Sequence, residues 1–245
     1  IIVTTCTANV YIKNSIPSLE TSITRYYDIF TNSSKYTVYV SNATIGDFYN
    51  ALVCNSCEPY AILGGVTSSK FTGSQSNFSN DSEIKSGSSP ISGTRPAENI
   101  GMAVFKDDKY IDKLSAIDTL CYSLIENAVD TFNICINSPF EENKKIDISV
   151  SSLEPAHTNI NLSKDVPVIT IKLNLTGKTL TGQENLRISD SSTLTKINDS
   201  MKDYLSSKMK DYLYKTSRNY KCDLNGFNKL AKQKFLTIPD YTNYD

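Results

Sequence analysis

The sequence has no tryptophan, a single histidine, three methionines and no long apolar run. A membrane-spanning helix needs about 20 consecutive apolar residues, and no stretch of the 245 residues meets that requirement. A catalytic triad or a histidine-containing metal site would have to use the one histidine, His157. These absences argue against a transmembrane protein and against histidine-based chemistry.

An excess of either charge is also lacking. The chain has 25 Lys and Arg residues against 26 Asp and Glu residues. A nucleic-acid-binding protein would show a basic excess or a basic patch. The composition therefore argues against nucleic acid as a partner, while the length is enough to bury a core in one large domain or two ordinary ones.

The six cysteines are too dispersed for a disulfide scaffold in a chain of this size. Cys121 and Cys135 fall at apolar positions, so we expect them to be small buried side chains. Cys54-Asn55-Ser56-Cys57 has the spacing of a redox motif, but no βαβ context and no second cysteine pair accompanies it. This segment is better explained as a loop with either one local disulfide or two free thiols.

The chain is organised around a predicted helix from Asp190 to Asn219. Asp190, Ser191 and Ser192 offer N-cap oxygens, and Asp211 and Lys215 are spaced as an i,i+4 ion pair. A second apolar run extends to Phe235 and begins near Asn225-Gly226. The apolar residues of the long helix recur every three or four positions, on one stripe that needs a partner: Leu194, Ile197, Met201, Leu205, Met209, Tyr212 and Leu213.

The strands expected before this helix provide that partner. Residues 101–105 and 110–114 flank Lys106-Asp107-Asp108-Lys109 as a hairpin, and residues 117–128 have helical spacing. Apolar and polar residues then alternate over 132–136, 146–150, 160–162 and 169–175, with turns at Ser138-Pro139, Glu154-Pro155 and Asp165-Pro167. Alternation of this kind predicts one buried face. We therefore expect an α+β fold, a largely antiparallel sheet covered on one face by long C-terminal helices.

A smaller α/β piece is predicted at the N-terminus. It comprises a helix from Pro17 to Phe30, a strand at residues 36–40 and a helix at residues 45–53 that buries Phe48 and Leu52. Thr44 and Asp47 are spaced as a capping box for this last helix, whereas residues 8–12 fit either a strand or a helical turn. Residues 67–96 are rich in Ser, Gly, Thr and Asn. The predicted division is a remnant domain over 1–66, a linker or surface loop over 67–97 and a C-terminal domain over 98–245.

Several segments, in this order and spacing, resemble the Ger(x)C family. They are Glu98-Asn99-Ile100-Gly101-Met102-Ala103-Val104-Phe105-Lys106, Ile117-Asp118-Thr119-Leu120-Cys121-Tyr122, Asn137-Ser138-Pro139-Phe140-Glu141, Tyr212-Leu213-Tyr214-Lys215-Thr216-Ser217 and Gly226-Phe227. Upstream, Thr44-Ile45-Gly46-Asp47-Phe48-Tyr49-Asn50 and Glu58-Pro59-Tyr60-Ala61 resemble the middle region of the same family.

This family consists of the lipoprotein C subunits of nutrient germinant receptors in spore-forming bacteria. The resemblance implies a subunit acylated on a cysteine, tethered to the outer face of the spore inner membrane and assembled with A and B membrane subunits. We expect the anchor cysteine to lie upstream of this sequence. We also expect the family chain to continue beyond Asp245 with a strand, whose absence would leave a bare sheet edge.

No catalytic, cofactor-binding or metal-binding residue is predicted. His157 lies in the turn-like Pro155-Ala156-His157-Thr158 without a nucleophile motif, and Gly177-Lys178-Thr179 lacks the first glycine of a phosphate-binding loop and is better explained as a turn between strands. The acid pairs Asp107-Asp108 and Glu141-Glu142 are expected in turns. The interaction candidates are tyrosines, a residue enriched at protein interfaces, that do not all fit the apolar stripe: Tyr204, Tyr214, Tyr220, Tyr241 and Tyr244.

Three functions are compatible with the sequence. The first is a non-enzymatic germinant-receptor subunit that acts by protein–protein contacts. The second is a nutrient-binding lipoprotein, which needs a pocket. The third is a spore-envelope hydrolase, which needs a cluster of reactive groups that the sequence does not display.

Overall fold

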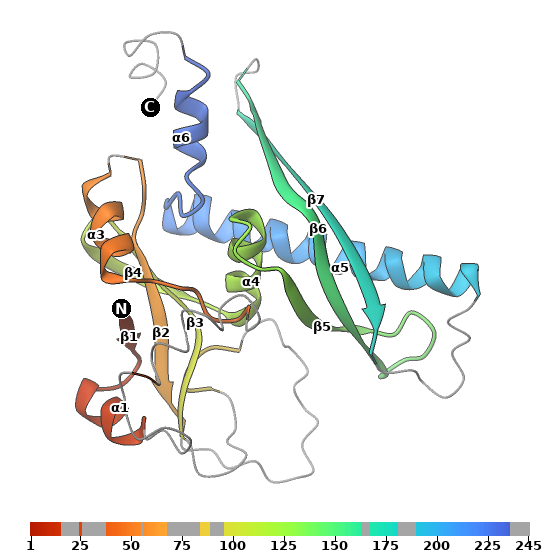
Figure 1. Cartoon of the computed structure of the whole chain (residues 1–245), viewed down its shortest axis with the longest axis horizontal. Helices are drawn as coiled ribbons and strands as arrows, with labels where there is room; N and C mark the ends of the chain where they lie inside the picture. The colour runs from red at the N-terminus through yellow and green to blue at the C-terminus, as the bar shows by residue number, and fades with distance from the viewer. Residues whose placement is uncertain are drawn as a thin grey trace.

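The chain forms an α+β fold with two sheets and a long C-terminal helix, as the sequence predicts (Figure 1). The computed structural model describes residues 1–15, 25, 38–54, 56–67, 84–88, 96–162, 167–180 and 190–235.

The first sheet has the strand order β1-β2-β3-β4. Its strands are β1 (Ile2–Thr4), β2 (Tyr60–Val66), β3 (Ala97–Lys106) and β4 (Lys109–Leu114). β1 runs parallel to β2, and the other pairs are antiparallel. The predicted hairpin is confirmed as β3 and β4. Because β2 and β3 pair across residues 67–96, both sides of the predicted linker contribute to this sheet; the division into domains stays a prediction.

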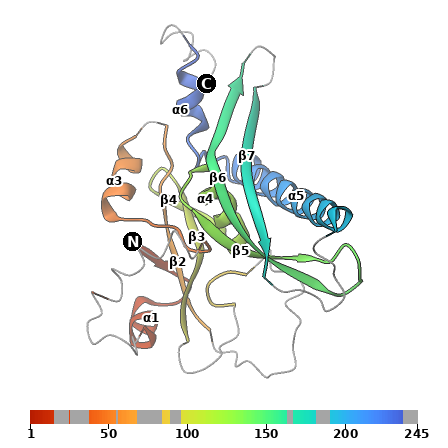
Figure 2. The same ribbon diagram turned by 45° about the vertical axis from the view of Figure 1, so that its right-hand side comes forward.

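Helices lie on both faces of the first sheet. α4 (Ala116–Ile125) is buried along its whole length and shares a core with Met102 and Val104 of β3. Phe105, which points to the opposite face, contacts Phe48 of α3 (Ile45–Val53), with ring centroids 5.1 Å apart. α1 (Ala8–Asn14) also packs against β2. Figures 1 and 2 both show α1 and α3 on the side of the sheet away from α4.

The second sheet contains three antiparallel strands in the order β5-β6-β7. They are β5 (Thr131–Asn137), β6 (Lys145–Asn161) and β7 (Val168–Thr179). The predicted turn at Glu154-Pro155 is wrong: β6 continues through it, with register shifts between Ser152 and His157. A β-bulge accommodates a proline that a regular ladder would not, so two predicted strands form one.

The predicted long helix is confirmed, with a change of helix type near its end. α5 (Ser191–Tyr214) continues into the π-helix η2 (Lys215–Tyr220), and α6 (Phe227–Lys232) follows after Gly226. α5 buries Ile197, Leu205, Met209 and Tyr212 against α4 and the second sheet, whereas Leu194, predicted on the stripe, is 42% exposed. One hydrophobic core thus includes side chains from both sheets and the C-terminal helix.

The N-terminal predictions are partly confirmed. Residues 8–14 are helical, and Thr44 and Asp47 form the predicted capping box. Leu52 was predicted to be buried but is 40% exposed, because α3 faces the sheet through Phe48 instead. The helix predicted over 17–30 lies outside the described residues except for residue 25; of the strand predicted at 36–40, the structure describes 38–40, where Val40 forms a single bridge with Gly101.

Candidate functional site

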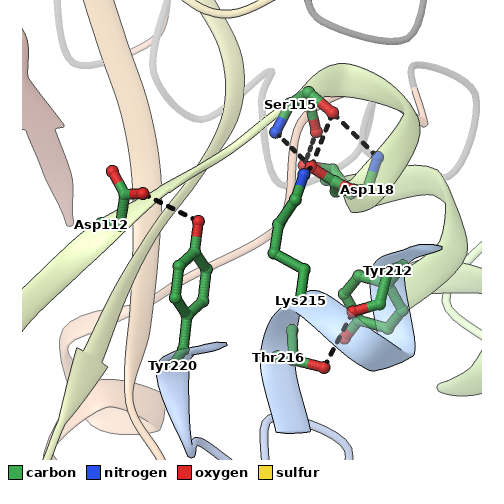
Figure 3. A network of polar contacts seen from close by, with 8 residues as sticks. Asp112, Ser115, Asp118, Tyr212, Lys215, Thr216 and Tyr220 are labelled. Carbon is green, nitrogen blue, oxygen red and sulfur yellow. Dashed lines mark hydrogen bonds and ion pairs between the residues drawn. The ribbon is translucent and has the colours of Figure 1, made fainter. Parts of the chain in front are cut away.

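A network of polar contacts joins the end of α5 and the helical turn after it to β4 and α4. We call it the α4–α5 junction and define it by the residues labelled in Figure 3: Asp112, Ser115, Asp118, Tyr212, Lys215, Thr216 and Tyr220.

A buried carboxylate lies at the centre of the junction. Ser115 caps α4, and the Asp118 Oδ2 atom accepts hydrogen bonds from the Ser115 backbone amide at 3.0 Å and from its hydroxyl at 2.7 Å. The Lys215 ammonium lies 2.6 Å from the same oxygen, although the two residues are 97 positions apart in the sequence. Asp118 is only 3% exposed. A buried charge requires such partners, so Lys215 ties the C-terminal helix to the start of α4.

A second contact joins η2 to the first sheet. The Tyr220 hydroxyl donates a hydrogen bond to Asp112 on β4, with a distance of 2.8 Å. Burial alone would raise the pKa of Asp112. Hydrogen bonds from the Lys113 amide and from Tyr220, together with the positive charges of Lys85 and Lys113, outweigh burial, so the pKa of this carboxyl is lowered. Burial and the hydrogen bond to Asp112 raise the pKa of the Tyr220 phenol. Both shifts favour a neutral tyrosine that donates to a charged aspartate.

The π-helix η2 positions both contacts. A π-turn inserts one residue relative to an α-helix and frequently occurs at functional sites. The Thr216 hydroxyl donates to the Tyr212 carbonyl at 3.0 Å, and the segment ends at Lys221, whose φ of 50° lies in the left-handed region. The Cys222 amide then donates to the Thr216 carbonyl. This local geometry directs Lys215 and Tyr220 towards neighbouring parts of the first sheet and α4, as Figure 3 shows.

Tyr212 extends the junction towards α6. Its side chain is fully buried, and its hydroxyl donates to the Asn225 side-chain oxygen at 2.7 Å. The Asn225 amide in turn donates to Glu126, directly after α4. Burial raises the pKa of the Tyr212 phenol. Lys215, Tyr220 and Tyr212 therefore connect the C-terminal helical segment to α4, to β4 and to the segment before α6.

A pocket of about 580 Å³ opens between the two sheets, beside the N-terminal end of α4. Its lining is mainly apolar, and the lining residues with polar side chains include Tyr39, Asn133, Asp147 and Tyr204. Pockets of this size that hold small ligands are usually apolar with a few polar groups. The residues that line it are Tyr39, Ile84, Ile100, Ala116, Ile117, Asn133, Ile134, Cys135, Asp147, Leu180 and Tyr204.

The predicted interaction tyrosines occupy different environments. Tyr204 packs against the core and lines the pocket, and Tyr220 belongs to the junction. Tyr214 is 56% exposed, with the Arg218 guanidinium 4.9 Å from its ring centroid. Tyr241 and Tyr244 lie outside the described residues. The three described tyrosines therefore lie in different environments, and an interaction role for the five stays a prediction.

The structure also shows where the cysteines, the single histidine and the Gly177-Lys178-Thr179 segment lie. Cys54 and Cys57 form a disulfide, one of the two arrangements that the sequence left open. Cys121 is buried as predicted, whereas Cys135 is only partly buried. His157 is exposed within β6, opposite Lys172, instead of in a turn, and Gly177-Lys178-Thr179 ends β7 instead of forming a turn.

Among the described residues, no group of three or more His, Cys, Asp or Glu side chains is arranged to hold a metal ion. No described helix is long and apolar enough to cross a membrane.

Sequence reasoning missed the junction. The spacing of Ser115 and Asp118 is that of a capping box, which the sequence could have revealed. Lys215 was predicted to pair with Asp211 on its own helix and instead reaches Asp118, a contact across tertiary structure that no local pattern indicates. Tyr220 and Asp112 likewise carry no sequence signal for their hydrogen bond.

Comparison with known proteins gives two similarities. A sequence profile described as "Spore germination B3/ GerAC like, C-terminal" matches residues 100–244, from β3 through the α4–α5 junction to the C-terminal region. The structure described as "Crystal Structure of the GerBC protein" has 16% sequence identity and a TM-score of 0.49 over 78% of this chain and 50% of that chain. This chain therefore spans about half of that protein's length, and no curated protein sequence matches it.

The family profile covers more than half of the chain and confirms the resemblance noted in the sequence. The chain belongs to the GerAC-like family of spore germination proteins.

Proposed function

We propose that this protein is the C subunit of a spore nutrient germinant receptor and that it acts without catalysis, through protein–protein contacts with the A and B membrane subunits. The observation that carries the proposal is family membership over residues 100–244. The α4–α5 junction supports a scaffold role, because its charged and polar groups connect elements of the fold to one another. We place the protein on the outer face of the spore inner membrane, held by a lipid anchor.

Deletion of the gene in spores tests this function. The deletion strain should lose its response to the nutrients of this receptor and retain its response to a chemical germinant that bypasses receptors. Purification of the intact lipoprotein from spore membranes should also recover the A and B subunits. A normal nutrient response in the deletion strain would contradict the proposal.

The pocket between the sheets favours one second candidate, a subunit that itself binds the nutrient. Its volume of about 580 Å³ and its apolar lining with a few polar groups suit a small molecule with an apolar portion. Calorimetric titration with amino acids, sugars and nucleosides separates the two candidates. A binding heat that disappears in Ile134→Trp, which fills the pocket, would support nutrient binding, whereas the scaffold role alone predicts no heat.

A further inference from the structure

The C-terminal helical segment, which we define as residues 208–234, differs in charge from the rest of the chain. It contains eight Lys and Arg residues against two Asp residues, a net charge of +6. Since the whole chain has 25 Lys and Arg against 26 Asp and Glu, the remaining residues have 17 basic against 24 acidic side chains, a net charge of −7. The near-neutral total is thus the sum of an acidic remainder and a basic segment, which comprises the end of α5, η2 and α6.

Most of the basic side chains in this segment are exposed, whereas its acids are few. Asp211 is the one exposed acid of residues 208–234, all of which the structure describes. Asp223 is partly buried and accepts hydrogen bonds from the Phe227 and Asn228 amides. Six of the eight basic residues are exposed, namely Lys210, Arg218, Lys221, Lys229, Lys232 and Lys234.

The inner side of the segment, towards the first sheet and α4, contacts three acids. They accept hydrogen bonds from Lys215, Tyr220 and Asn225 of the segment. Adding these three acids to the segment still leaves a net charge of +3. The other charges close to this inner side are three positive and two negative, so they do not cancel the excess. The three acids are Asp118, Asp112 and Glu126, and the other charged residues are Lys85, Lys106, Lys113, Glu58 and Asp107.

The outer side of the segment presents basic residues together with an aromatic ring. Lys210, Tyr214 and Arg218 follow one another at intervals of four residues, which places them along one side of a helix. Tyr214 is 56% exposed, and the Arg218 guanidinium lies 4.9 Å from its ring centroid. Figures 1 and 2 both show α6, which carries Lys229 and Lys232, at the C-terminal end of α5. The basic residues of the two helices therefore adjoin at this end of the molecule.

The composition of this surface selects among possible partners. Lys is depleted at protein–protein interfaces, yet Arg218 is the only exposed basic residue of the segment that is not Lys. Lys side chains on helices meet the head groups of anionic lipids, and tyrosine is enriched at the boundary between membrane and water. Lipid anchors are also commonly reinforced by a polybasic surface. The proposed location, outside the inner membrane, separates this surface from nucleic acid.

We propose that the outer side of residues 208–234 lies against the head groups of a membrane that contains anionic lipid, with Lys210, Arg218 and Lys229 among the side chains in contact. The inference rests on the proposed function, since it orients the subunit on the membrane to which the lipid anchor holds it.

Co-sedimentation with vesicles tests the surface, using the full 245-residue chain without an acyl group. The partition coefficient should be about 100-fold or more higher for vesicles of equal parts phosphatidylcholine and phosphatidylglycerol than for phosphatidylcholine alone, at about 0.1 M salt. At about 0.5 M salt this preference should disappear, because salt screens the attraction between charges. Equal partition into the two kinds of vesicle at low salt, or a preference that salt leaves unchanged, would overturn the proposal.

Charge reversal identifies the residues that bind. The combined variant Lys210→Glu, Arg218→Glu and Lys229→Glu should lower the partition coefficient into the anionic vesicles by about 100-fold. Its melting temperature should stay within about 2 °C of the wild type, because the exchanged side chains are exposed.

A second combined variant controls for total charge. Lys109→Glu, Lys172→Glu and Lys178→Glu make the same change in net charge at exposed positions of β4 and β7. The partition coefficient of this control should change by less than about three-fold, because its substitutions lie outside the proposed contact. An equal loss in the two variants would show that only the total charge matters and would refute the proposed surface.

Photo-crosslinking of the acylated protein in intact spores distinguishes lipid from protein. A benzoylphenylalanine replaces Tyr214, and the control replaces Tyr49 of α3, which is 62% exposed on the opposite side of the first sheet. The expected result is a lipid adduct from position 214 and none from position 49. A protein adduct from position 214 in place of lipid would instead identify a protein partner for the basic surface and contradict the proposal.

These outcomes are separate from those that test the receptor role. If the chain does not prefer anionic vesicles but deletion of the gene abolishes the nutrient response, the membrane-facing surface is wrong and the receptor role stands. If the nutrient response survives deletion, the receptor role is wrong, and the vesicle and crosslinking results still decide whether residues 208–234 lie against lipid.

Discussion

At the scale of single residues, the α4–α5 junction depends on one buried carboxylate with three donors. Asp118 accepts from the amide and hydroxyl of Ser115 and from Lys215. Lys215 is partly exposed, with 33% of its side chain accessible, so its aliphatic portion packs while its ammonium meets the acid. The ion pair therefore stabilises the fold chiefly because a buried Asp118 carboxylate without a positive partner would raise the free energy of the folded state.

Lys215→Met should destabilise the protein, since it leaves Asp118 buried with only its two local hydrogen bonds. We expect a loss of about 2 kcal/mol in the free energy of unfolding, which corresponds to a fall of about 4–8 °C in melting temperature for a protein of this size. Thermal unfolding followed by circular dichroism measures it. Lys210→Met, at an exposed position of the same helix, is the control and should change the free energy by less than about 0.5 kcal/mol. Equal melting temperatures for the two variants would contradict the role of the ion pair.

Glu58 gives a pH-dependent prediction. Because burial raises its pKa in the folded state, the native state binds its proton more tightly than the unfolded state does. The contribution of this group to stability is thus fully present below the unfolded pKa of about 4.3 and is lost as pH rises through the folded value. Glu58→Gln keeps an acceptor for the Asp107 amide without the charge.

We therefore expect the Glu58→Gln variant to melt about 1–3 °C above the wild type at pH 7 and to match it at pH 4. Scanning calorimetry at the two pH values tests this, with Glu142→Gln as the exposed control. A variant that melts below the wild type at pH 7 would show that the charge of Glu58 stabilises the fold.

At the scale of secondary-structure elements, glycines with different backbone conformations make a matched pair. Gly101 in β3 has a φ of 94°, and a Cβ atom there would lie 2.3 Å from the Leu114 carbonyl oxygen. Gly46 in the first turn of α3 has only the Thr44 hydroxyl nearby, at an ordinary 3.6 Å. The first site requires glycine, and the second tolerates a side chain.

Gly101→Ala should lower the free energy of unfolding by about 2–4 kcal/mol, from backbone strain and the clash with β4. Gly46→Ala should raise it by about 0.5–1 kcal/mol, because alanine favours the helix and restricts the unfolded chain. Urea unfolding curves measure both changes, and a change of the same sign in the two variants would be inconsistent with this account.

Elements with strong periodicity were predictable from the sequence, and their tertiary contacts were not. The alternation of apolar and polar residues predicted strands β5 and β7, and the apolar stripe predicted helix α5. The bulged continuation of β6 through Pro155 was missed because proline normally ends a strand, whereas a bulge accepts it. Leu52 was assigned to the core from helical spacing alone, yet spacing shows only that a face is apolar and does not show what covers it.

At the scale of the whole molecule, the two sheets share a core. Met102 and Val104 of the first sheet, Leu120 of α4 and Ile146 and Ile148 of the second sheet belong to one hydrophobic cluster. The family profile begins at residue 100, within β3 (Ala97–Lys106), so the boundary of the matched region falls inside the strand that pairs with β2. The candidate site could not be predicted from sequence at this scale, because the junction joins residues about 100 positions apart.

Hydrogen exchange on the full chain tests whether residues 1–66 and 98–245 behave as the separate domains that the composition predicts. Ala61 and Leu63 of β2 are buried together with Ala103 of β3, in a cluster that draws residues from both proposed domains. Opening β2 alone would expose these side chains and leave the amides of β3 without their partners. We therefore expect the amides of β2 and β3 to exchange with the same opening free energy, within about 1 kcal/mol, and to respond equally to Leu63→Ala. If instead the amides of β2 exchange much faster than those of β3, and Leu63→Ala accelerates exchange only before residue 67, the two parts unfold independently. The predicted boundary within 67–97 would then separate two domains that fold as independent units.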